Sequence, residues 1–320
     1  MKLLVTGGAG YIGSVMAAQL VAAGHEVTVL DDLSTGHADA VPPGARFVHG
    51  DLRADAAAVL AGGFDAVLHF AARSLVGESV ANPSLYWNNN LGGTLALLEA
   101  MRSTGVATIV FSSTAAAYGE PETLPVEETA QPRPTSPYGA SKLAVDTALA
   151  EYARLHGFAA VSLRYFNVAG AFRDDSGRWV GERHTTETHL IPNILRIARD
   201  HSGPVSIYGD DYPTTDGSCI RDYVHVSDVV AAHLLALSDC SPGEHKIYNL
   251  GCGTGYSNFE VLATCREVTG LDIPVEITGR RPGDPAVLVA SSGRISRDLG
   301  WKPERGLRDV VADAWACGYR

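Results

Sequence analysis

The feature that most constrains the fold of this chain is the alternation of short apolar runs with helical patterns through its first half. The predicted strands are residues 2–6, 26–30, 46–49, 66–70, 108–112 and 159–166, and the predicted helices are residues 11–23, 54–61, 82–104 and 136–157. Apolar strands that alternate with helices form a parallel sheet with helices on both faces. The first half therefore predicts an α/β fold with a doubly wound parallel sheet of the Rossmann type.

The pattern changes beyond residue 171, where Pro/Gly-rich loops separate shorter elements. The predicted helices there are residues 190–201, 228–238, 258–269, 292–299 and 307–316, and the predicted strands are residues 205–208, 246–249 and 274–277. We expect a large domain over residues 1–171 and a smaller C-terminal α/β lobe over residues 172–320. Some segments of the lobe are expected to pack back onto the large domain.

The composition excludes several classes of protein. Lys and Arg number 25 against 36 Asp and Glu, a net charge of −11, so neither nucleic acid nor an anionic membrane is expected as a partner. No uncharged apolar run reaches the roughly 18 residues of a membrane span, and no secretory signal is expected. The five cysteines form no C-x-x-C pair, so we predict reduced thiols in a cytoplasmic protein, with no disulfide framework and no metal site.

A glycine-rich turn with the spacing G-x-x-G-x-x-G, at Gly7, Gly10 and Gly13, joins the first predicted strand to the first predicted helix. Small residues at this turn let the backbone approach a pyrophosphate, which the N–H groups of the helix N-terminus then bind. Asp31 ends the second predicted strand, where a carboxylate holds the ribose of an adenosine. The next basic residue is Arg46, so a 2′-phosphate would face a carboxylate without a nearby cation. We therefore predict NAD and not NADP as cofactor.

Small or polar residues also follow the other predicted strands. Asp51 ends the third, Phe70-Ala71-Ala72 the fourth, Ser112-Ser113-Thr114 the fifth and Asn167 the sixth. Ligands of open parallel sheets bind outside the carboxyl ends of the strands. The set therefore indicates one continuous site along this edge of the sheet.

Tyr138 and Lys142 form a Y-x-x-x-K pair on the predicted helix 136–157. Residues i and i+4 share one helix face, and the preceding Ser136 and Pro137 suit a helix start. A Lys ammonium and a positively charged nicotinamide would both lower the pKa of the tyrosine toward the range of a general base. The chain has only four lysines, so the pair has little chance of arising at random. A hydroxyl from Ser112–Thr114 would share the substrate oxygen.

At this point the chain resembles the extended short-chain dehydrogenase/reductases and, within them, the UDP-galactose 4-epimerase family from end to end. The glycine turn, Ser112-Ser113-Thr114, Tyr138…Lys142 and Arg164-Tyr165-Phe166-Asn167 carry the wider resemblance. The narrower one rests on longer segments: residues 69–79, Asn88-Asn89-Asn90-Leu91-Gly92-Gly93-Thr94, residues 209–217, Arg221-Asp222-Tyr223-Val224-His225-Val226 and Arg281-Pro282-Gly283-Asp284.

The resemblance implies an enzyme that holds NAD tightly and interconverts UDP-galactose and UDP-glucose through a transient 4-keto sugar. It implies Tyr138 as the acid/base residue, Thr114 as its hydroxyl partner and Lys142 as the residue that binds the nicotinamide ribose. The residues predicted to bind the cofactor, from the strand ends and from this resemblance, are Gly7, Gly10, Tyr11, Ile12, Gly13, Asp31, Asp51, Leu52, Phe70, Ala71, Ala72, Ser74, Asn90, Ser112, Tyr138, Lys142, Tyr165 and Phe166. Those predicted to bind the substrate are Thr114, Asn167, His189, Leu190, Tyr208, Arg221, Arg281, Asp284 and Leu288.

Three positions depart from the family pattern as the resemblance describes it. Thr114 replaces a serine and keeps the hydroxyl, while Ser74 replaces a lysine that assists the cofactor in some members. Leu288 stands where a tyrosine restricts the sugar pocket and a small residue admits N-acetyl groups. Its intermediate volume predicts good turnover of UDP-galactose and weaker turnover of UDP-N-acetylgalactosamine. The family also implies a homodimer formed through helices 82–104 and 136–157.

Alternative functions stay open at this point. A nucleotide-sugar dehydratase needs an acidic pair directly after the active-site Thr, where this chain has Ala115-Ala116-Ala117. A reductase would use NADPH and exchange it after each turnover, whereas Asp31 favours NAD over NADP. An NAD-binding module without activity would leave the Tyr138, Lys142 and Thr114 set unexplained. Asp222 and His225 suggest a hydrolytic dyad, but no nucleophile accompanies them.

Overall fold

A seven-stranded sheet organises the first part of the chain in the computed structural model, which describes residues 1–184, 187–281 and 284–318. Its strands are β1 (Lys2–Thr6), β2 (Glu26–Asp31), β3 (Arg46–His49), β4 (Ala66–His69), β5 (Thr108–Thr114), β6 (Ala159–Tyr165) and β12 (His245–Leu250). They run in the order β12-β6-β5-β4-β1-β2-β3, and the pairings from β1 to β5 are parallel. The chain order reverses between β1 and β4, which is where doubly wound sheets bind ligands.

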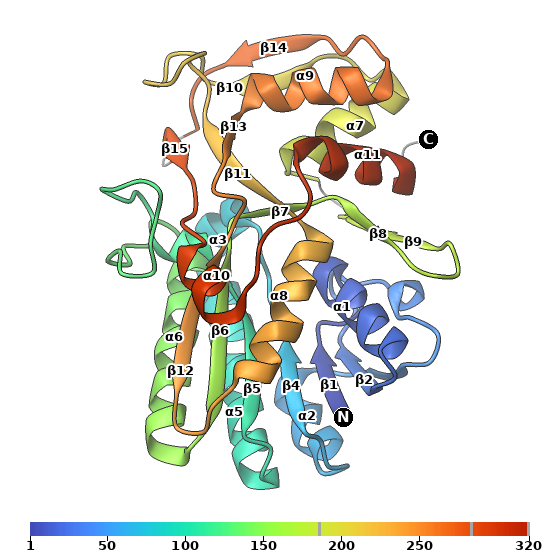
Figure 1. The fold of residues 1–320 in the computed structure, drawn as a ribbon, viewed down its shortest axis with the longest axis vertical. Coiled ribbons are helices and arrows are strands. Elements are labelled where there is room, and N and C mark those ends of the chain that lie inside the picture. Colours follow the sequence, from blue (N-terminus) through green and yellow to red (C-terminus); the bar gives the residue numbers. More distant parts are fainter. Residues whose placement is uncertain (185–186, 282–283, 319–320) are drawn as a thin grey trace. The chain divides into compact units, whose positions relative to one another are not determined.

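The chain divides into two compact units, each built from several segments (Figure 1). Unit 1 comprises Met1–Gly119, Gln131–Arg164 and Val230–Tyr248. Unit 2 comprises Glu120–Ala130, Tyr165–Val229 and Asn249–Arg320. The chain therefore passes several times between the two units, and neither unit is one continuous stretch of sequence.

Helices cover the sheet of unit 1 (Figure 1). They are α1 (Tyr11–Ala22), α2 (Leu52–Leu60), α3 (Val76–Ala81), α4 (Pro83–Tyr86), α5 (Gly93–Thr104), α6 (Pro137–His156) and most of α8 (Val226–Asp239). Leu4 and Val67 of the sheet share one buried cluster with Leu60 of α2, Leu97 of α5 and Leu149 of α6. Helix α1 packs against β1 and β2. Because neighbouring strand residues point to opposite faces, strands buried on both faces read as continuous apolar runs, as the sequence predicts.

The predicted helix 82–104 is not one regular α-helix. Helix α4 is followed by a π-helical segment, Trp87–Gly92, before α5 begins. The buried Asn90 lies in this segment, where its amide accepts a hydrogen bond from Arg73 N (2.9 Å) and donates one to Arg73 O (3.0 Å). A π turn adds one residue to the helical turn and changes which side chains face inward. Sequence periodicity alone did not reveal it.

Unit 2 contains smaller sheets and their own helices. The strands are β7 (Asn167–Ala169), β8 (Ala171–Arg173), β9 (Trp179–Gly181), β10 (Val205–Tyr208), β11 (Ile220–His225), β13 (Gly255–Ser257), β14 (Val275–Thr278) and β15 (Val287–Leu288), and the helices are α7 (Leu190–Asp200), α9 (Asn258–Thr269), α10 (Gly293–Leu299) and α11 (Leu307–Gly318). Strand β11 pairs with β7, β13 and β15, while β10 pairs with β14 and β8 with β9. Ile194 of α7, Leu262 of α9 and Val310 of α11 belong to one buried core.

The predicted elements of the second half are confirmed, with end shifts of up to two residues. The predicted strand 246–249, however, joins the seven-stranded sheet as β12 beside β6. The strands β7, β8, β9, β11, β13 and β15 were not predicted, because most are too short to show a periodic pattern. Among the described helices, none is both long and apolar enough to span a membrane. All five cysteines are free thiols.

Candidate active site

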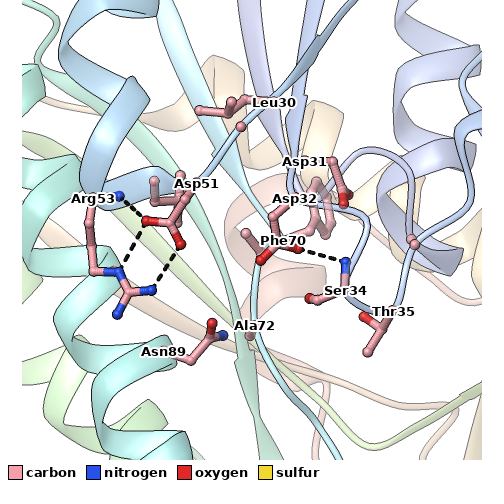
Figure 2. Close-up of a pocket in the computed structure, with 17 residues that line it drawn as sticks. Leu30, Asp31, Asp32, Ser34, Thr35, Asp51, Arg53, Phe70, Ala72 and Asn89 are labelled. Carbon is pink, nitrogen blue, oxygen red and sulfur yellow. Dashed lines mark hydrogen bonds and ion pairs between the residues drawn. The ribbon is translucent and has the colours of Figure 1, made fainter.

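A pocket open to solvent lies at the carboxyl edge of the large sheet, where β1, β2, β3 and β4 end (Figure 2). Its walls are formed by Gly7, Gly10, Leu30, Asp31, Asp32, Ser34, Thr35, Gly36, Gly50, Asp51, Leu52, Arg53, Phe70, Ala71, Ala72, Asn89 and Gly93. Eight of the residues predicted to bind the cofactor are among them: Gly7, Gly10, Asp31, Asp51, Leu52, Phe70, Ala71 and Ala72. The structure therefore brings the strand-end residues together in one pocket.

Close packing around the glycine turn accounts for two of its three glycines. Gly7 has φ +71°, and a Cβ atom there would lie 2.5 Å from Ala71 N at the end of β4. A Cβ at Gly13 would lie 2.2 Å from the Gly7 carbonyl oxygen. At Gly10 the nearest contact, 3.3 Å from the Gly7 oxygen, is much looser, although Gly10 lines the pocket. Packing within the protein thus requires glycine at 7 and 13, while Gly10 leaves room for a ligand.

Asp31 is held rigidly at the end of β2. Its Oδ2 accepts a hydrogen bond from Ala9 N (2.9 Å), and its Oδ1 accepts one from Leu33 N (2.8 Å). Burial raises the pKa of the carboxyl group, and both backbone hydrogen bonds oppose this effect. Each carboxylate oxygen keeps a second lone pair, so the group can still accept hydrogen bonds from ribose hydroxyls.

Sequence reasoning missed part of the pocket wall. Arg53 faces the pocket across from Asp31, and its Nε and Nη2 donate to the Asp51 carboxylate at 3.1 and 2.9 Å (Figure 2). The sequence predicts no cation near Asp31, whereas the folded chain brings the Arg53 guanidinium to the same pocket. The carboxylate of Asp51 neutralises the charge of Arg53. The other residues missed are Leu30, Asp32, Ser34, Thr35, Gly36, Gly50, Asn89 and Gly93. Leu30, Asp32 and Gly50 adjoin a predicted strand-end residue in the sequence, which is the signal that could have found these three.

Tyr138 stands in the first turn of α6, at a position set by the local sequence. The Ser136 hydroxyl caps the helix by accepting from Gly139 N (3.2 Å), and Pro137 occupies the first turn. A Cβ at Gly139 would lie 2.4 Å from the Ala116 carbonyl oxygen. The start of α6 therefore packs closely against the turn that follows β5.

The same packing brings Tyr138 to Thr114. The Thr114 hydroxyl accepts from Ala116 N (3.1 Å), and a hydrogen bond between the Thr114 and Tyr138 side chains lowers the pKa of the phenol. Burial has the larger effect and raises that pKa above its ordinary value of 10. The sequence predicts that Lys142 and the nicotinamide together lower the pKa of Tyr138. The side chains of the protein do not produce this lowering by themselves, because the effect of burial on the phenol is larger. The ring of Tyr86 packs edge-on against Tyr138, with 6.3 Å between centroids.

Lys142 is almost fully buried, with 3% of its surface exposed. Its Nζ donates to the Ser112 carbonyl oxygen (2.8 Å) and lies 4.7 Å from the centroid of the Phe111 ring. Burial lowers the pKa of the ammonium to about 7, and the negative charge of Asp146 opposes this shift. The amine therefore titrates near neutral pH and not near its ordinary 10.5.

Asp146 lies one helical turn beyond Lys142 and is also buried. Its Oδ2 accepts from Arg164 Nη2 (2.9 Å), Arg164 Nε (3.1 Å) and the Ser113 hydroxyl (3.2 Å). Its Oδ1 is shielded from solvent and has no hydrogen-bond partner among the described residues. The guanidinium of Arg164 in turn lies 4.8 Å from the centroid of the Tyr118 ring. A buried ion pair thus supports the strand and the helix that carry the catalytic candidates.

The remaining predicted cofactor residues of unit 1 lie outside the pocket wall. Tyr11, Ile12 and Gly13 form the first turn of α1, which begins without a side-chain cap or an acidic residue. Asn90 uses its amide to hold the backbone of Arg73 and to donate to the Ser141 hydroxyl (3.1 Å), so it positions the loop after β4. Ser74 is exposed in that loop.

Unit 2 gathers several of the predicted substrate residues. Arg221 lies in β11 opposite Leu288 of β15, and its Nη2 lies 3.5 Å from the Asp284 carboxylate. The guanidinium of Arg281 lies 3.9 Å from the centroid of the Tyr208 ring. Pro282 and Gly283 are outside the described residues. The structure therefore forms two small groups, one around Arg221 and one around Arg281.

The other predicted residues of unit 2 lie elsewhere in it. Tyr165 and Phe166 are buried at the end of β6, and Asn167 begins β7. His189 occupies the N-cap position of α7 without a capping side-chain bond, and its Nδ1 hydrogen-bonds to Glu182 (2.5 Å). Leu190 begins the helix. Burial lowers the pKa of His189, but the hydrogen bond and the charges of Glu182 and Glu187 raise it above its ordinary value.

A protein-family model described as the NAD dependent epimerase/dehydratase family matches residues 3–251. The chain belongs to this family. The fold class and the NAD cofactor predicted from the sequence are thereby confirmed. The dependence on NAD, which the family description states, agrees with the glycine turn, the uncapped start of α1 and the carboxylate of Asp31.

Relatives within this epimerase/dehydratase family cover nearly the whole chain. The UDP-glucose 4-epimerase of Corynebacterium glutamicum is 53% identical over 318 residues, which cover 99% of this chain and 95% of the relative. The UDP-glucose 4-epimerase of Streptomyces lividans is 55% identical over 318 residues, covering 98% and 95%. The UDP-glucose 4-epimerase of Brucella ovis, solved in complex with NAD, has a TM-score of 0.93 at 40% identity and covers 100% of this chain and 99% of its own. That of Bifidobacterium longum, solved with NAD+ and UDP, has a TM-score of 0.92 at 35% identity, covering 99% and 98%.

Proposed function

We propose that this protein interconverts UDP-galactose and UDP-glucose by inverting the configuration at C4 of the sugar, with tightly bound NAD. The observation that carries the proposal is the hydrogen-bonded pair of Thr114 and Tyr138, with Lys142 one helical turn away. The names of the relatives support the same activity. The pocket of unit 1 suits the cofactor, because it combines a glycine turn with a carboxylate at the end of β2.

The residues of unit 1 supply the proton chemistry. When bound, NAD+ supplies an acceptor that takes a hydride from C4 and returns it to the opposite face of the 4-keto sugar. Tyr138 takes the proton of the 4-hydroxyl group as that hydroxyl becomes a carbonyl, and it returns the proton when the sugar is reduced again. Thr114 donates a hydrogen bond to the same oxygen and orients it. Lys142, in its charged form, binds the nicotinamide ribose and favours the tyrosinate.

The residues of unit 2 supply charge for the UDP group. A diphosphate is bound best by forked guanidinium donors, which Arg221 and Arg281 provide. Asp284 lies 3.5 Å from Arg221 and limits its rotation. Asn167, His189, Leu190 and Tyr208 complete the proposed contacts with the nucleotide and the sugar. A UDP anchored in this way stays bound while the keto sugar turns over.

Two alternatives are less well supported. A dehydratase needs an acidic pair after the active-site Thr, but Ala115-Ala116-Ala117 forms a short 3-10 turn without a titratable group. A protein that only binds NAD has no use for a buried lysine that titrates near neutral pH beside a hydrogen-bonded tyrosine. The epimerase accounts for both features.

The breadth of sugars accepted depends on Leu288 in this proposal. Leu288 is half-buried in β15, opposite Arg221. We expect UDP-galactose to be the better substrate and UDP-N-acetylgalactosamine to turn over more slowly. Equal values of kcat/KM for the two sugars would refute the role of Leu288.

The deciding experiment uses purified protein without added cofactor. UDP-galactose is added, and the products are separated by ion-pairing chromatography. UDP-glucose is identified by its retention time against an authentic standard, because the two sugar nucleotides have the same mass, and a dehydrated product is identified by its lower mass. We expect UDP-glucose from the native protein and a loss of about 10³-fold or more in kcat for Tyr138→Phe. A 4-keto-6-deoxy product would refute the proposal, as would full activity of the variant. Tyr86→Phe is the matched control, because its ring contacts Tyr138 but its hydroxyl bonds to Leu75 and Glu78.

The protein is also proposed to be a cytoplasmic homodimer. Trp87, Leu95 and Leu155 are 39%, 38% and 58% exposed on the helical stretches from Pro83 to Thr104 and from Pro137 to His156. Exposed large apolar residues on neighbouring helices mark a surface for association. A monomeric mass in light scattering would refute the dimer. The five free thiols support a reducing compartment.

A further inference from the structure

Two histidines and two glutamates converge between β9 and α7. They are Glu182, His184, Glu187 and His189, and we refer to them as the His–Glu cluster. Each offers one donor atom, and these four atoms all lie within 4.8 Å of one another. Their spacing in the sequence is E-x-H-x-x-E-x-H, a pattern that the search for cysteine pairs could not find.

We propose that the His–Glu cluster binds one Zn2+ ion per chain. The proposal goes beyond the epimerase activity and does not depend on it. The two proposals share His189, whose Nδ1 faces the cluster and whose Nε2 is left for the contact with the nucleotide. Imidazole nitrogens and carboxylate oxygens are common ligands of Zn2+, and two carboxylates balance its charge. Mg2+ and Ca2+ prefer sites made of oxygen atoms alone, so the two imidazoles argue against them.

The distances agree with such a site. A four-coordinate Zn2+ with bonds of about 2.1 Å separates neighbouring ligand atoms by roughly 3.4 Å. His184 Nδ1 lies 3.2 Å from Glu182 Oε1 and 3.3 Å from Glu187 Oε2. His189 Nδ1 lies 2.5 Å from Glu182 Oε1 and 3.8 Å from Glu187 Oε1. Glu187 faces His184 with Oε2 and His189 with Oε1, so one of its two oxygens would serve as the ligand. The His189–Glu182 contact has to lengthen for both atoms to contact one ion.

A pair of salt bridges is the competing explanation, and one atom argues against it. His184 Nδ1 is shielded from solvent and has no hydrogen-bond partner among the described residues, despite two carboxylate oxygens at 3.2 and 3.3 Å. A protonated imidazole would turn its N–H toward one of them. Ligand atoms that face a shared ion lie close together without hydrogen bonds.

The surroundings of the cluster resemble those of a metal site. The side chains of Glu182 and Glu187 are only 6% and 10% exposed, and shielded carboxylates need a compensating charge. Glu187 Oε1 also accepts from the backbone N–H groups of Thr188 and His189, each at 2.8 Å. Such outer hydrogen bonds orient metal ligands. With four protein ligands the site is closed, so we assign the ion a structural role at the start of α7.

The first test is a titration of metal-free, untagged full-length protein with Co2+, which reports the geometry of Zn2+ sites by its colour. We expect one equivalent to produce the intense visible absorption bands of a four-coordinate ion, and one equivalent of Zn2+ to displace it. Zn2+ should also raise the Tm of the protein. Weak bands of a six-coordinate ion, or fewer than about 0.2 equivalents bound, would overturn the proposal.

The second test assigns the ligands. Glu182→Gln and His184→Asn should each weaken Co2+ binding by at least about 100-fold. His201→Asn is the matched control, because His201 is exposed at the end of α7 and its left-handed backbone (φ 48°) suits asparagine. Binding unchanged in both cluster variants would overturn the assignment. If a variant does not fold, the spectrum of the native protein still decides, and epimerase activity enters neither readout.

Discussion

The two units present their candidate functional groups in opposite ways. In unit 1 the lysine of the proposed catalytic set is buried, 3% exposed, and rests on a buried ion pair of Asp146 and Arg164. In unit 2 the proposed substrate ligand Arg281 is exposed and the side chain of Asp284 is 40% exposed, while that of Arg221 is 13% exposed. Burial displaces the pKa of a lysine downward and that of a tyrosine upward, whereas a guanidinium stays charged in water or in protein.

Lysine and arginine are therefore suited to different tasks in the two units. An arginine cannot release its proton at neutral pH, so it serves for anion binding but not for a tuned acid or base. Lys142 is the lysine that the fold buries, and its pKa falls to about 7. The comparison predicts that substitutions in unit 1 alter folding, cofactor retention and pH dependence, and that those in unit 2 alter KM.

The largest effect is expected for Gly7→Ala. The new Cβ would lie 2.5 Å from the backbone of Ala71 at a φ of +71°, so we expect a loss of more than about 5 kcal/mol of folding free energy and of bound NAD. Urea unfolding and the cofactor content after gel filtration measure both. Gly24→Ala is the matched control, because Gly24 has φ +80° but no atom within 4 Å of the new Cβ. It should cost about 1–2 kcal/mol and retain NAD. Equal costs for the two variants would contradict the packing argument.

Asp146→Asn should have the next largest effect. It leaves the buried Arg164 without its ion-pair partner, which costs about 3 kcal/mol of folding free energy. It also removes the charge that favours the Lys142 ammonium, so the pKa of Lys142 falls further below its present value of about 7. The ammonium is then lost at lower pH, and the alkaline limb of kcat/KM should move down by about one pH unit.

The pH profile separates this role from a loss of stability, which changes amplitude but not the position of the limb. Asp239→Asn is the control, since Asp239 pairs with the partly exposed Lys246 (2.9 Å) in the same unit. Its profile should match that of the native protein. An unshifted limb in Asp146→Asn would show that Asp146 does not tune Lys142.

Arg221→Ala should raise KM for UDP-galactose by about 100-fold with little change in kcat, because a charge-assisted contact with phosphate contributes roughly 2–3 kcal/mol. Steady-state kinetics measure both constants. Arg280→Ala is the control, since Arg280 is exposed and paired with Asp211 (2.6 Å). A fall in kcat with unchanged KM would move Arg221 into the catalytic set and weaken the contrast between the units.

Leu288→Ala should have the smallest effect. A smaller side chain opposite Arg221 leaves more room for an N-acetyl group, so kcat/KM for UDP-N-acetylgalactosamine should rise about 10-fold, as expected for a hydrophobic pocket. The value for UDP-galactose should change little, and the ratio of the two constants is the measurement. A ratio that falls would show that Leu288 contacts the acetyl group and does not exclude it.

Much of unit 1 could be predicted because its signals are local. Apolar strands with a glycine turn after the first of them indicate a parallel sheet, and the ends of those strands then form the pocket around Gly7, Asp31 and Ala71. The π turn at Trp87–Gly92 could not be predicted, because it depends on Asn90 bonding to the backbone of Arg73 from another loop. Arg53 was missed for a similar reason, since only the folded chain brings it across the pocket from Asp31.

The candidate groups of unit 2 were suggested by resemblance and not by periodicity. Strand β15 has two residues, too few for an alternating pattern, yet it puts Leu288 beside Arg221. Spacing on a helix does not show that Tyr138 is buried, and among the protein's own groups this burial raises its pKa. The lowering by Lys142 and a bound nicotinamide together stays a prediction. The contact between Leu288 and Arg221 and the burial of Tyr138 both arise from tertiary packing, which sequence patterns do not report.

Strand β12 has a consequence for how this protein is made. It is the edge strand of the large sheet beside β6, yet its residues, His245–Leu250, follow about half of unit 2 in the sequence. During synthesis the ribosome must therefore complete about four-fifths of the polypeptide before that sheet has all its strands. A truncated chain that ends at the close of β6 would leave the edge of β6 unpaired and open to aggregation. Neither unit can thus be exchanged between proteins as a continuous cassette.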